Sequence, residues 1–346
     1  MATVAQDQAT IGTDVQLTPY SQGRDLPLFV QPRERALRDD PDVALAWFAA
    51  HRAAIHALLL ETGALAFRGF ALYDTSAFGR WLDGFDCAKI GYTAGAAPRA
   101  AVAPKVFEST QAPADQVLGL HQEMAYLPRY PARIAFFCRL ASVTGGETFL
   151  ADMRAVTAAI DPAFLDEVER RGVMYHRNFR DDGISMGHPS LDVMHRSWQD
   201  AFDAGDRDLP LAECRAMGLE PRWLEDGSLA TTYVAPGIVR HPETGERLWF
   251  NQLATQIIRA ESWGEAPTAL FRRHYGAGRP LPYAVTFGDG APIPEAPLAT
   301  VYAAYAAHRV GFAWSHGDVL MLDNHLVAHG RNSFTGLRDV QVGLLD

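Results

Sequence analysis

Two histidine-bearing segments, one in the middle of the chain and one near its end, constrain the fold more than any other feature. The first holds His121 and Glu123 in LGLHQEMAYLP, and the second holds His325 and His329 in GDVLMLDNHLVAHGR. Glu123 and His329 are 206 positions apart (329 − 123). Residues at i and i+2 of an extended strand point to the same side, so His121 and Glu123 can face one ion. If a C-terminal histidine joins them, strands from distant parts of the sequence must lie side by side.

Helix and strand patterns are interleaved along the chain without the strand–helix–strand repeat of a parallel sheet. One helix is expected from Asp40 to Glu61, with Asp40 as N-cap and Gly63 as its stop, and the same signals recur from Asp161 to Gly172. Residues 63–70, GALAFRGF, alternate as a strand does. Further helices are expected near residues 209–217, 266–275 and 296–309, and strands over residues 231–240 and 247–251. The pattern predicts an α+β protein.

No internal repeat, low-complexity run or Gly/Ser linker marks a domain boundary. We therefore expect a mobile N-terminal arm over residues 1–25 and a single domain over residues 26–346, with helical insertions between the two histidine segments. Residues 178–189, NFRDDGISMGHP, are polar and contain glycine, as expected of a long loop. This loop is either a lid that closes over a substrate or a variable surface excursion.

The residue types in the two segments suit a metal ion. Two imidazoles and one carboxylate on one face of a metal leave adjacent positions open, which is the arrangement of mononuclear non-haem Fe(II) sites. A His-x-Glu sequence alone is a weak signal, because a solvated pair gives the same pattern. A closed zinc site and a protein without catalytic turnover are the other interpretations.

Arg338 lies nine residues after the last histidine and begins an alternation with the apolar residues 340, 342 and 344. This pattern places its guanidinium on an apolar strand face, where it requires an anion. A guanidinium binds a carboxylate through two parallel hydrogen bonds. A cosubstrate with a carboxylate at one end and a 2-oxo acid at the other would thus fit both Arg338 and a metal. The alternative is a salt bridge from Arg338 to Asp339 or another carboxylate.

Over most of its length the chain resembles the Fe(II)/2-oxoglutarate-dependent oxygenases of the taurine dioxygenase and clavaminate synthase type. It is most similar to amino-acid hydroxylases of nonribosomal peptide pathways, through the ordered motifs LHQEMAYLPRYPARIAFFC, GGETFLADMRAV, SWQDAF, GERLWFNQ, GDGAPIP and DVLMLDNHLVAHGRNSFTGLR. The resemblance implies a double-stranded β-helix, a jelly-roll relative of the cupins, with helices packed outside and the N-terminal helix over one sheet.

The resemblance also implies a role for each site residue. The implied Fe(II) ligands are His121, Glu123 and His329. Thr148 of the GGET motif would support the far carboxylate of 2-oxoglutarate together with Arg338. The remaining histidines of the C-terminal region, His316 and His325, would be structural or would support the ligands.

Three further residues are candidates for substrate contact: Gln122, Asn251 and Arg331. Gln122 stands where relatives often have asparagine, and its longer amide would shift any hydrogen bond at the mouth of the site. For Asn251 and Arg331 the favoured interpretation is structural, as residues that cap turns. Four nearby aromatic residues are interpreted as core and not as a substrate cage: Tyr126, Trp249, Phe250 and Trp314.

The resemblance implies that 2-oxoglutarate and O2 are cosubstrates and that an unactivated C–H bond is hydroxylated. The predicted substrate is a free or carrier-protein-tethered amino acid of secondary metabolism, modified at Cβ. Desaturation, epoxidation or cyclisation needs the same residues and stays open, as does a sulfonate or another small acid as substrate.

Charge and composition limit the partners and the location of the protein. Its 41 Asp and Glu against 31 Lys and Arg give a net charge of −10, which disfavours nucleic acid and anionic membranes as partners. The start, MATVAQDQATIGTDVQL, lacks the features of a signal peptide, so we expect a cytoplasmic protein. Cys87, Cys138 and Cys214 form no CxxC pair and are expected to be packing residues.

Overall fold

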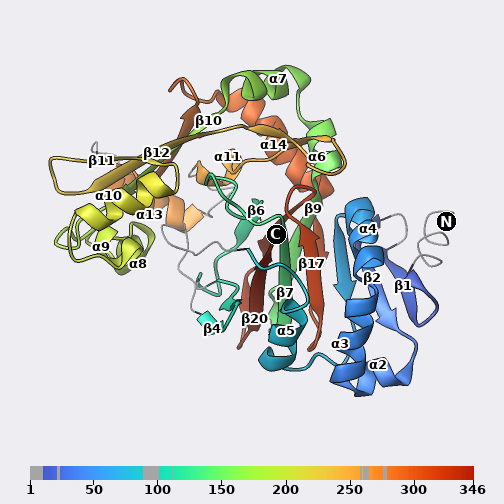
Figure 1. The fold of residues 1–346 in the computed structure, drawn as a ribbon. Helices are drawn as coiled ribbons and strands as arrows, with labels where there is room; N and C mark the ends of the chain where they lie inside the picture. The colour runs from blue at the N-terminus through green and yellow to red at the C-terminus, as the bar shows by residue number, and fades with distance from the viewer. Residues whose placement is uncertain are drawn as a thin grey trace.

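The computed structural model describes residues 11–21, 24–88, 101–110, 112–257, 259, 265–275 and 279–346. Figure 1 shows strands at the centre of the molecule, the N-terminal helices on one side of them and a helical lobe on the other. Helices and strands are interleaved along the chain, which confirms the predicted mixed fold class.

An eight-stranded sheet forms the centre of the molecule. In spatial order its strands are β1 (Val15–Ser21), β2 (Arg24–Pro32), β3 (Ala64–Phe67), β17 (Val319–Asp323), β7 (Arg133–Leu140), β20 (Asp339–Leu345), β5 (Val106–Glu108) and β4 (Ala101–Ala103). Neighbouring strands are antiparallel except β2 and β3, which are parallel. The last strand of the chain thus pairs with one from its middle.

A second sheet of four antiparallel strands carries the two histidine segments. In spatial order its strands are β16 (Val310–Phe312), β9 (Thr148–Asp152), β18 (Val327–Arg331) and β6 (Leu118–His121). Phe136 and Val342 of the large sheet share one buried apolar cluster with Leu150 and Val327 of the second sheet. The two sheets therefore pack against each other, because burial of their apolar faces requires it.

The chain passes directly from the large sheet to the second sheet at one turn. Strand β17 ends at Asp323, and after residues 324–326 the chain continues as β18. All five residues of each of these strands are buried. This turn, called here the β17–β18 turn (residues 323–326), therefore determines where His329 lies.

Four helices, α2 (Arg35–Asp39), α3 (Pro41–Ala50), α4 (Arg52–Thr62) and α5 (Thr75–Leu82), belong to the N-terminal region. Trp47 and Leu58 of α3 and α4 share a second apolar cluster with Phe67 and Met321 of the large sheet. The predicted N-terminal helix thus covers one sheet, but it is two helices, bent by 71°. The break lies at His51, whose ring stacks on Trp47 with centroids 4.4 Å apart.

The expected caps of this helical region are present. Asp40 accepts hydrogen bonds from the backbone N–H groups of Asp42 and Val43, and Gly63 ends α4 in the left-handed conformation with φ 78°. The mobile arm predicted over residues 1–25 is wrong for residues 15–21, which pair with β2 as strand β1. Val15 is fully buried there, which explains the order. Residues 1–10 and 22–23 of the arm lie outside the described residues.

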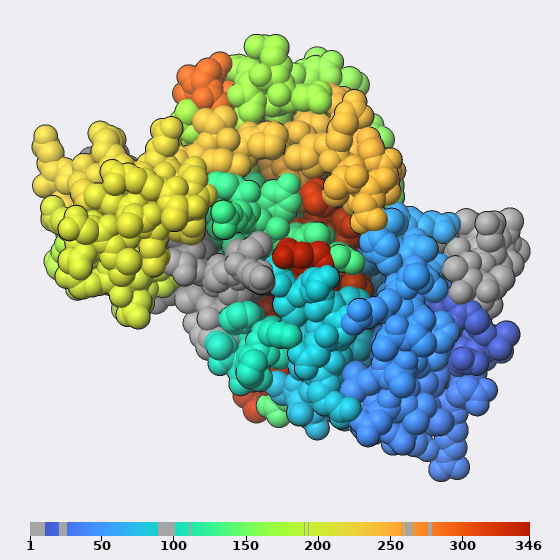
Figure 2. All heavy atoms as spheres, in the orientation of Figure 1, coloured from blue at the N-terminus to red at the C-terminus, as the bar shows by residue number. Residues whose placement is uncertain are grey.

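The remaining elements form a third sheet, a hairpin, a short two-stranded sheet and further helices. The third sheet is ordered β11 (Glu220–Trp223), β12 (Leu229–Ala235), β10 (Val173–Phe179) and β15 (Tyr283–Phe287). The hairpin joins β13 (Ile238–Arg240) to β14 (Arg247–Trp249), and the short sheet pairs β8 (Thr144–Gly145) with the distant β19 (Phe334–Thr335). The helices are α6 (Met153–Ala159), α7 (Pro162–Arg171), α8 (Pro189–Met194), α9 (Trp198–Phe202), α10 (Asp208–Ala216), α11 (Leu253–Gln256), α13 (Glu265–Tyr275) and α14 (Glu295–His308). Figure 2 shows α8, α9 and α10 as a yellow lobe beside the sheets.

Two of these elements differ from the sequence predictions. The strand expected over residues 231–240 is broken into β12 and β13, because Pro236 lacks the N–H that a continuous ladder needs. In the loop expected over residues 178–189, the first two residues belong to β10. The Arg180 guanidinium donates to the carbonyl oxygens of Ile184 and His195, at 2.9 and 2.8 Å, which ties this loop together. Its role as a lid stays a prediction.

In the described part of the chain, no single helix is both long and apolar enough to cross a membrane. The bent pair α3 and α4 passes that test only when the two helices are taken together, by length and composition. Cys87, Cys138 and Cys214 are free thiols.

Candidate functional site

Three side chains from the two histidine segments meet between β6 and β18. His121, the last residue of β6, is the cross-strand partner of His329 on β18, and their ring centroids are 4.5 Å apart. Nε2 of His329 lies 3.5 Å from Oε2 of Glu123. Ligand atoms of all three side chains lie within 4.8 Å of one another. Glu123 and His329 are buried and His121 is half-buried, so the group has an inner side and an outer side.

Glu123 reaches this group from a turn, which corrects the strand geometry expected from the sequence. Strand β6 ends at His121, and Met124 has a positive φ of 57° in the turn that follows. Asn324 holds Glu123 in place: the Glu123 N–H donates to Oδ1 of Asn324 at 2.7 Å, and Nδ2 of Asn324 donates to the Glu123 carbonyl at 3.0 Å. Asn324 was not among the residues predicted for the site. An amide directly after an apolar strand was the available signal, because such side chains bind backbone groups at turns.

The ring of His121 is oriented as a metal ligand requires, and the ring of His329 is packed against an aromatic side chain. Nδ1 of His121 lies 2.9 Å from the carbonyl oxygen of Gly119, so it is the protonated nitrogen and the lone pair lies on Nε2. Phe136 packs against the ring of His329, with centroids 5.2 Å apart. Nδ1 of His329 is buried, and no described residue hydrogen-bonds to it. Two imidazoles and a carboxylate at this spacing fit a divalent cation.

The other two C-terminal histidines lie elsewhere. His325 is buried in a second group with His241 and Asp323, whose ligand atoms also lie within 4.8 Å of one another. Its ring stacks on that of Phe250 with centroids 4.7 Å apart. His316 is exposed, with Nδ1 2.7 Å from the carbonyl oxygen of Arg139. Only His329 is brought to His121 and Glu123.

Arg338 presents a half-buried guanidinium immediately before β20. Its Nε donates to the carbonyl oxygen of Gly146 at 3.3 Å, and within the described residues no ion pair joins it to a carboxylate. Asp339, the partner considered from the sequence, pairs instead with Arg139 at 2.5 Å. Burial, together with the charge of nearby Arg331, lowers the pKa of Arg338 to about 10, so the group stays cationic at neutral pH.

The strand alternation predicted after Arg338 is interrupted by a register shift between Asp339 and Val340. Val340, Val342 and Leu344 nevertheless belong to the cluster between the two sheets. Cys138 of that cluster lies near enough to Arg338 for each to influence the pKa of the other.

Thr148 is buried at the start of β9, where it pairs with Phe312 and Arg331 of the neighbouring strands. Its Oγ1 accepts a hydrogen bond from Nε1 of Trp314 at 3.0 Å. Thr148 lies two residues after Gly146, the hydrogen-bond acceptor of Arg338. Trp314 was interpreted as core, but it orients the hydroxyl of a candidate cosubstrate residue. The sequence gave no signal for this contact, because it joins positions 166 residues apart.

Gln122 lies on the opposite side from the ligands and is fully buried, which contradicts its predicted place at the mouth of the site. Its Nε2 donates to the carbonyl oxygens of Trp249 and His325, at 3.2 and 3.1 Å. Gln122 therefore connects the ligand segment to neighbouring backbone.

Asn251 and Arg331 also bind backbone, in line with the structural interpretation that the sequence favoured for both. Nδ2 of Asn251 donates to the Gly237 carbonyl at 2.7 Å, and its Oδ1 accepts the Leu253 N–H at 3.0 Å. The Arg331 guanidinium donates to the carbonyl oxygens of Ala112, Pro113 and Gln116. Both side chains are buried, so neither offers an exposed group for the substrate contact that was predicted.

Comparisons with known proteins agree with this geometry. Residues 24–344 match the family described as "Taurine catabolism dioxygenase TauD, TfdA family". The chain is 32% identical to the dapdiamide synthesis protein DdaC of Enterobacter agglomerans over 84% of each chain. It is 29% identical to a clavaminate synthase-like protein of Arabidopsis thaliana over 84% of this chain and 83% of that one.

A solved structure with a similar fold is that of PvcB from Pseudomonas aeruginosa, described as an Fe, alpha-ketoglutarate-dependent oxygenase from an isonitrile synthetic pathway. The TM-score is 0.51 at 17% identity, covering 96% of this chain and 92% of PvcB. The chain therefore belongs to the TauD, TfdA dioxygenase family, and it is an Fe(II)/2-oxoglutarate-dependent dioxygenase as the sequence predicts.

Proposed function

We propose that His121, Glu123 and His329 are the Fe(II) ligands of this dioxygenase. The observation that carries the proposal is their convergence within 4.8 Å from segments 206 positions apart. Three protein ligands leave positions for a cosubstrate and O2, whereas structural zinc sites are closed by four. The Gly119 carbonyl fixes the His121 ring so that Nε2 can donate to the metal.

Arg338 and Thr148 would bind the far carboxylate of 2-oxoglutarate. The Arg338 guanidinium is half-buried and cationic, so a bound carboxylate would neutralise a charge that no described carboxylate pairs with. Trp314 donates to Oγ1 of Thr148, which directs the hydroxyl proton elsewhere, toward an acceptor such as that carboxylate. These residues would orient the cosubstrate before any chemistry begins.

The proposed reaction converts 2-oxoglutarate, O2 and a substrate C–H group into succinate, CO2 and the hydroxylated substrate. Bound Fe(II) supplies the activation of O2 that oxidation of an unactivated C–H bond requires. The chain supplies the three ligands, the carboxylate site and apolar walls such as Phe136, which keep water away from the reacting atoms.

For the substrate, we propose a free or carrier-protein-tethered amino acid of secondary metabolism, hydroxylated at Cβ. The relationship to a dapdiamide synthesis protein and the motifs shared with amino-acid hydroxylases support this choice. The alternatives keep the same cofactors: desaturation, epoxidation or cyclisation of such a substrate, or reaction of a sulfonate or other small acid. We further propose a double-stranded β-helix as the core, formed by the two packed sheets, and a cytoplasmic location.

The test measures O2 consumption and succinate formation with Fe(II) and 2-oxoglutarate, while free and phosphopantetheine-bound amino acids are added one at a time. Mass spectrometry of each amino acid follows. His121→Ala removes a proposed ligand, and His316→Ala removes an exposed histidine outside the site as a matched control. We expect the His121 variant to lose turnover and the His316 variant to keep it.

Different results would contradict the ligand assignment and the choice of substrate. Wild-type succinate formation by His121→Ala would overturn the ligand assignment. Turnover that depends on His121, without a gain of one oxygen on any amino acid, would overturn only the substrate. A loss of two hydrogens, or an oxygen gain on an alkene substrate, would select the desaturation or epoxidation alternative.

A further inference from the structure

His241 and Asp323 form a buried hydrogen-bonded pair whose partners come from different parts of the fold. Nε2 of His241 lies 3.1 Å from Oδ2 of Asp323. His241 begins the turn HPETGE between β13 and β14, called here the 241–246 turn, and Asp323 ends β17. Both side chains are almost inaccessible to solvent. Neither residue has a role in the proposed chemistry, so the pair calls for a separate explanation.

The hydrogen bonds around His241 determine where its proton lies. Nδ1 accepts the backbone N–H groups of Glu243 and Thr244, at 3.1 and 3.0 Å. A nitrogen that accepts hydrogen bonds carries no proton, so the ring proton is on Nε2 and is donated to Asp323. Nε2 of His241 is therefore the hydrogen-bond donor, and the Asp323 carboxylate is the acceptor.

Asp323 uses its other oxygen to form the β17–β18 turn. Oδ1 accepts the backbone N–H groups of His325 and Leu326, at 2.8 and 3.0 Å. Burial raises the pKa of the Asp323 carboxyl, but the hydrogen bonds from His241 and Leu326 outweigh burial and leave that pKa below its ordinary value. The turn is therefore built around an anionic carboxylate, which His241 keeps in place.

The β17–β18 turn also forms hydrogen bonds with the first ligand segment, at Gln122 and Glu123. Asn324 makes two hydrogen bonds with the backbone of Glu123, at 2.7 and 3.0 Å. The carbonyl oxygen of His325 accepts from Nε2 of Gln122 at 3.1 Å. The same turn leads into β18 and so to His329. One turn thus joins the carboxylate ligand to the distal histidine.

We propose that His241, acting through Asp323, is a positioning residue that sets Glu123 and His329 in register for metal binding. This inference rests on the proposed role of His121, Glu123 and His329 as metal ligands. Residues that orient metal ligands through hydrogen bonds commonly change metal affinity by about 10- to 100-fold when they are altered.

A second metal ion at His241, Asp323 and His325 is the competing explanation of this cluster, since their ligand atoms lie within 4.8 Å of one another. The hydrogen bonds argue against it. Nδ1 of His241 already accepts two N–H groups, so a metal on Nε2 would require an imidazolate. Oδ1 of Asp323 is likewise occupied by two N–H groups. The geometry is that of a proton-donating pair.

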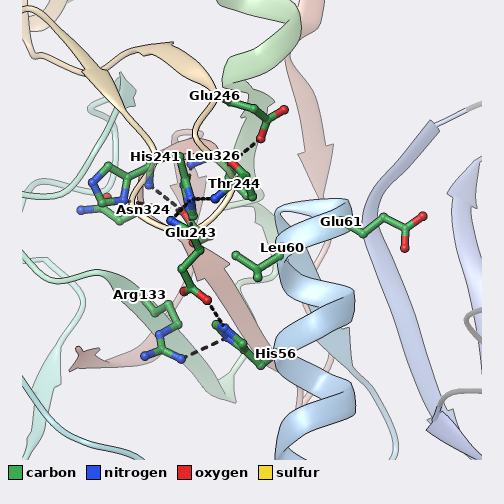
Figure 3. A network of polar contacts seen from close by, with 12 residues as sticks. His56, Leu60, Glu61, Arg133, His241, Glu243, Thr244, Glu246, Asn324 and Leu326 are labelled. Carbon is green, nitrogen blue, oxygen red and sulfur yellow. Dashed lines mark hydrogen bonds and ion pairs between the residues drawn. The ribbon is translucent and has the colours of Figure 1, made fainter.

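The 241–246 turn has a separate outer anchor that offers a control. Glu246 accepts two hydrogen bonds from Arg154, at 2.6 and 2.9 Å, and Arg154 also donates to the carbonyl oxygens of Leu60 and Glu61 in α4. Figure 3 shows Glu243 and Thr244 around His241, with Asn324 and Leu326 beside it and Glu246 farther out. Glu246→Gln would loosen the same turn without changing the His241–Asp323 pair.

The experiment titrates metal-free protein with Co(II) and follows the absorption of the bound ion, alongside the melting temperature of each metal-free variant. His241→Phe and Asp323→Asn remove the hydrogen bond, and we expect each to weaken Co(II) binding by about 10- to 100-fold. His241→Gln keeps an N–H donor for Asp323 and should stay close to wild type. Glu246→Gln should lower the melting temperature while leaving Co(II) affinity unchanged.

Wild-type affinity in both His241→Phe and Asp323→Asn, or an equal loss in Glu246→Gln, would overturn the positioning role. Should His241→Phe fail to fold, Asp323→Asn compared with Glu246→Gln decides. His329→Ala separates the two levels of inference. If it keeps wild-type Co(II) affinity, the proposed metal site itself is wrong; if it alone loses affinity, only the role of His241 is wrong.

Discussion

Arg338 is a half-buried cation whose described contacts are a single carbonyl oxygen and nearby aromatic and thiol groups, so its charge is available to a bound anion. We expect Arg338→Ala to raise the KM for 2-oxoglutarate by at least about 30-fold, since loss of one partner of a buried charged pair costs about 2 kcal/mol or more. Steady-state succinate formation at varied 2-oxoglutarate measures this.

The matched control for Arg338 is Arg139, an arginine 53% exposed in its side chain that pairs with the adjacent Asp339. Arg139→Ala removes the same type of side chain from the outer side of the strand and should leave that KM unchanged. Equal KM values in both variants and in wild type would exclude Arg338 from the cosubstrate site.

At the residue scale, the sequence identified residues whose side-chain types stand in a recognisable motif. His121, Glu123 and His329 were singled out in this way, and the structure brings them together. Asn324 and Trp314 were missed because they act through hydrogen bonds to groups far away in the sequence. Only the fold determines such contacts.

His195 joins two elements, since its ring bonds Oδ1 of Asn178 in β10 at 2.6 Å and the hydroxyl of Tyr275 in α13 at 2.8 Å. Burial, assisted by the charge of Arg180, lowers the pKa of His195 to about 4. As pH falls below about 6.5, the unfolded chain takes up a proton that the folded protein does not, so the free energy of unfolding decreases.

Between pH 7.5 and pH 5.0 we expect this one histidine to cost about 2 kcal/mol of stability. Urea unfolding of wild type and His195→Asn at the two pH values measures it, because the contributions of the other histidines cancel in the comparison. The variant should be less sensitive to acid by that amount. If the two proteins lose the same free energy of unfolding between these pH values, His195 is not the source of the acid sensitivity.

Gly330 lies between His329 and Arg331, where β18 approaches β6 closely. A Cβ at this position would lie 2.5 Å from the carbonyl oxygen of Leu118 and 3.0 Å from that of Gly119. Gly330→Ala should therefore push β6 and His121 away from His329, costing about 1 to 3 kcal/mol of stability. We expect it to impair Co(II) binding as well, measured by the same titration.

Gly79, in the interior of α5, provides the control for Gly330, because a Cβ there meets no atom within 4 Å. Gly79→Ala should leave metal binding intact and stabilise the helix by up to about 1 kcal/mol. If Gly330→Ala binds Co(II) as tightly as Gly79→Ala does, the close strand approach is not needed for the site.

At the element scale, local signals predicted caps well and interruptions poorly. Asp40, Gly63, Asp161 and Gly172 end or begin helices as expected, because each satisfies backbone groups locally. The bend at His51 and the ordering of β1 were not predicted. Strand β1 is ordered by pairing with the adjacent β2, and the two helices at the bend pack through Trp47 and Leu58 against Phe67 and Met321 of the large sheet.

For the whole molecule, metal binding should be linked to stability, because the ligand set exists only in the folded chain. At a Co(II) concentration about 100 times the Kd, the free energy of unfolding should rise by about 2.7 kcal/mol. Urea unfolding with Co(II) and with a chelator measures the difference. His329→Ala should show no such rise, and an equal rise in that variant would place the stabilising ion elsewhere.

Glu123 and His329 lie 206 positions apart and meet at the proposed metal site, so the chain between them is a closed loop that begins and ends there. Doubling the length of such a flexible loop raises the free-energy cost of bringing its ends together by only about 0.6 kcal/mol, because the entropy lost grows slowly with length. The helical lobe and the third sheet lie within this loop. Insertions and deletions there can reshape what surrounds the site at little thermodynamic cost, so one reaction centre can be combined with many differently shaped substrate chambers.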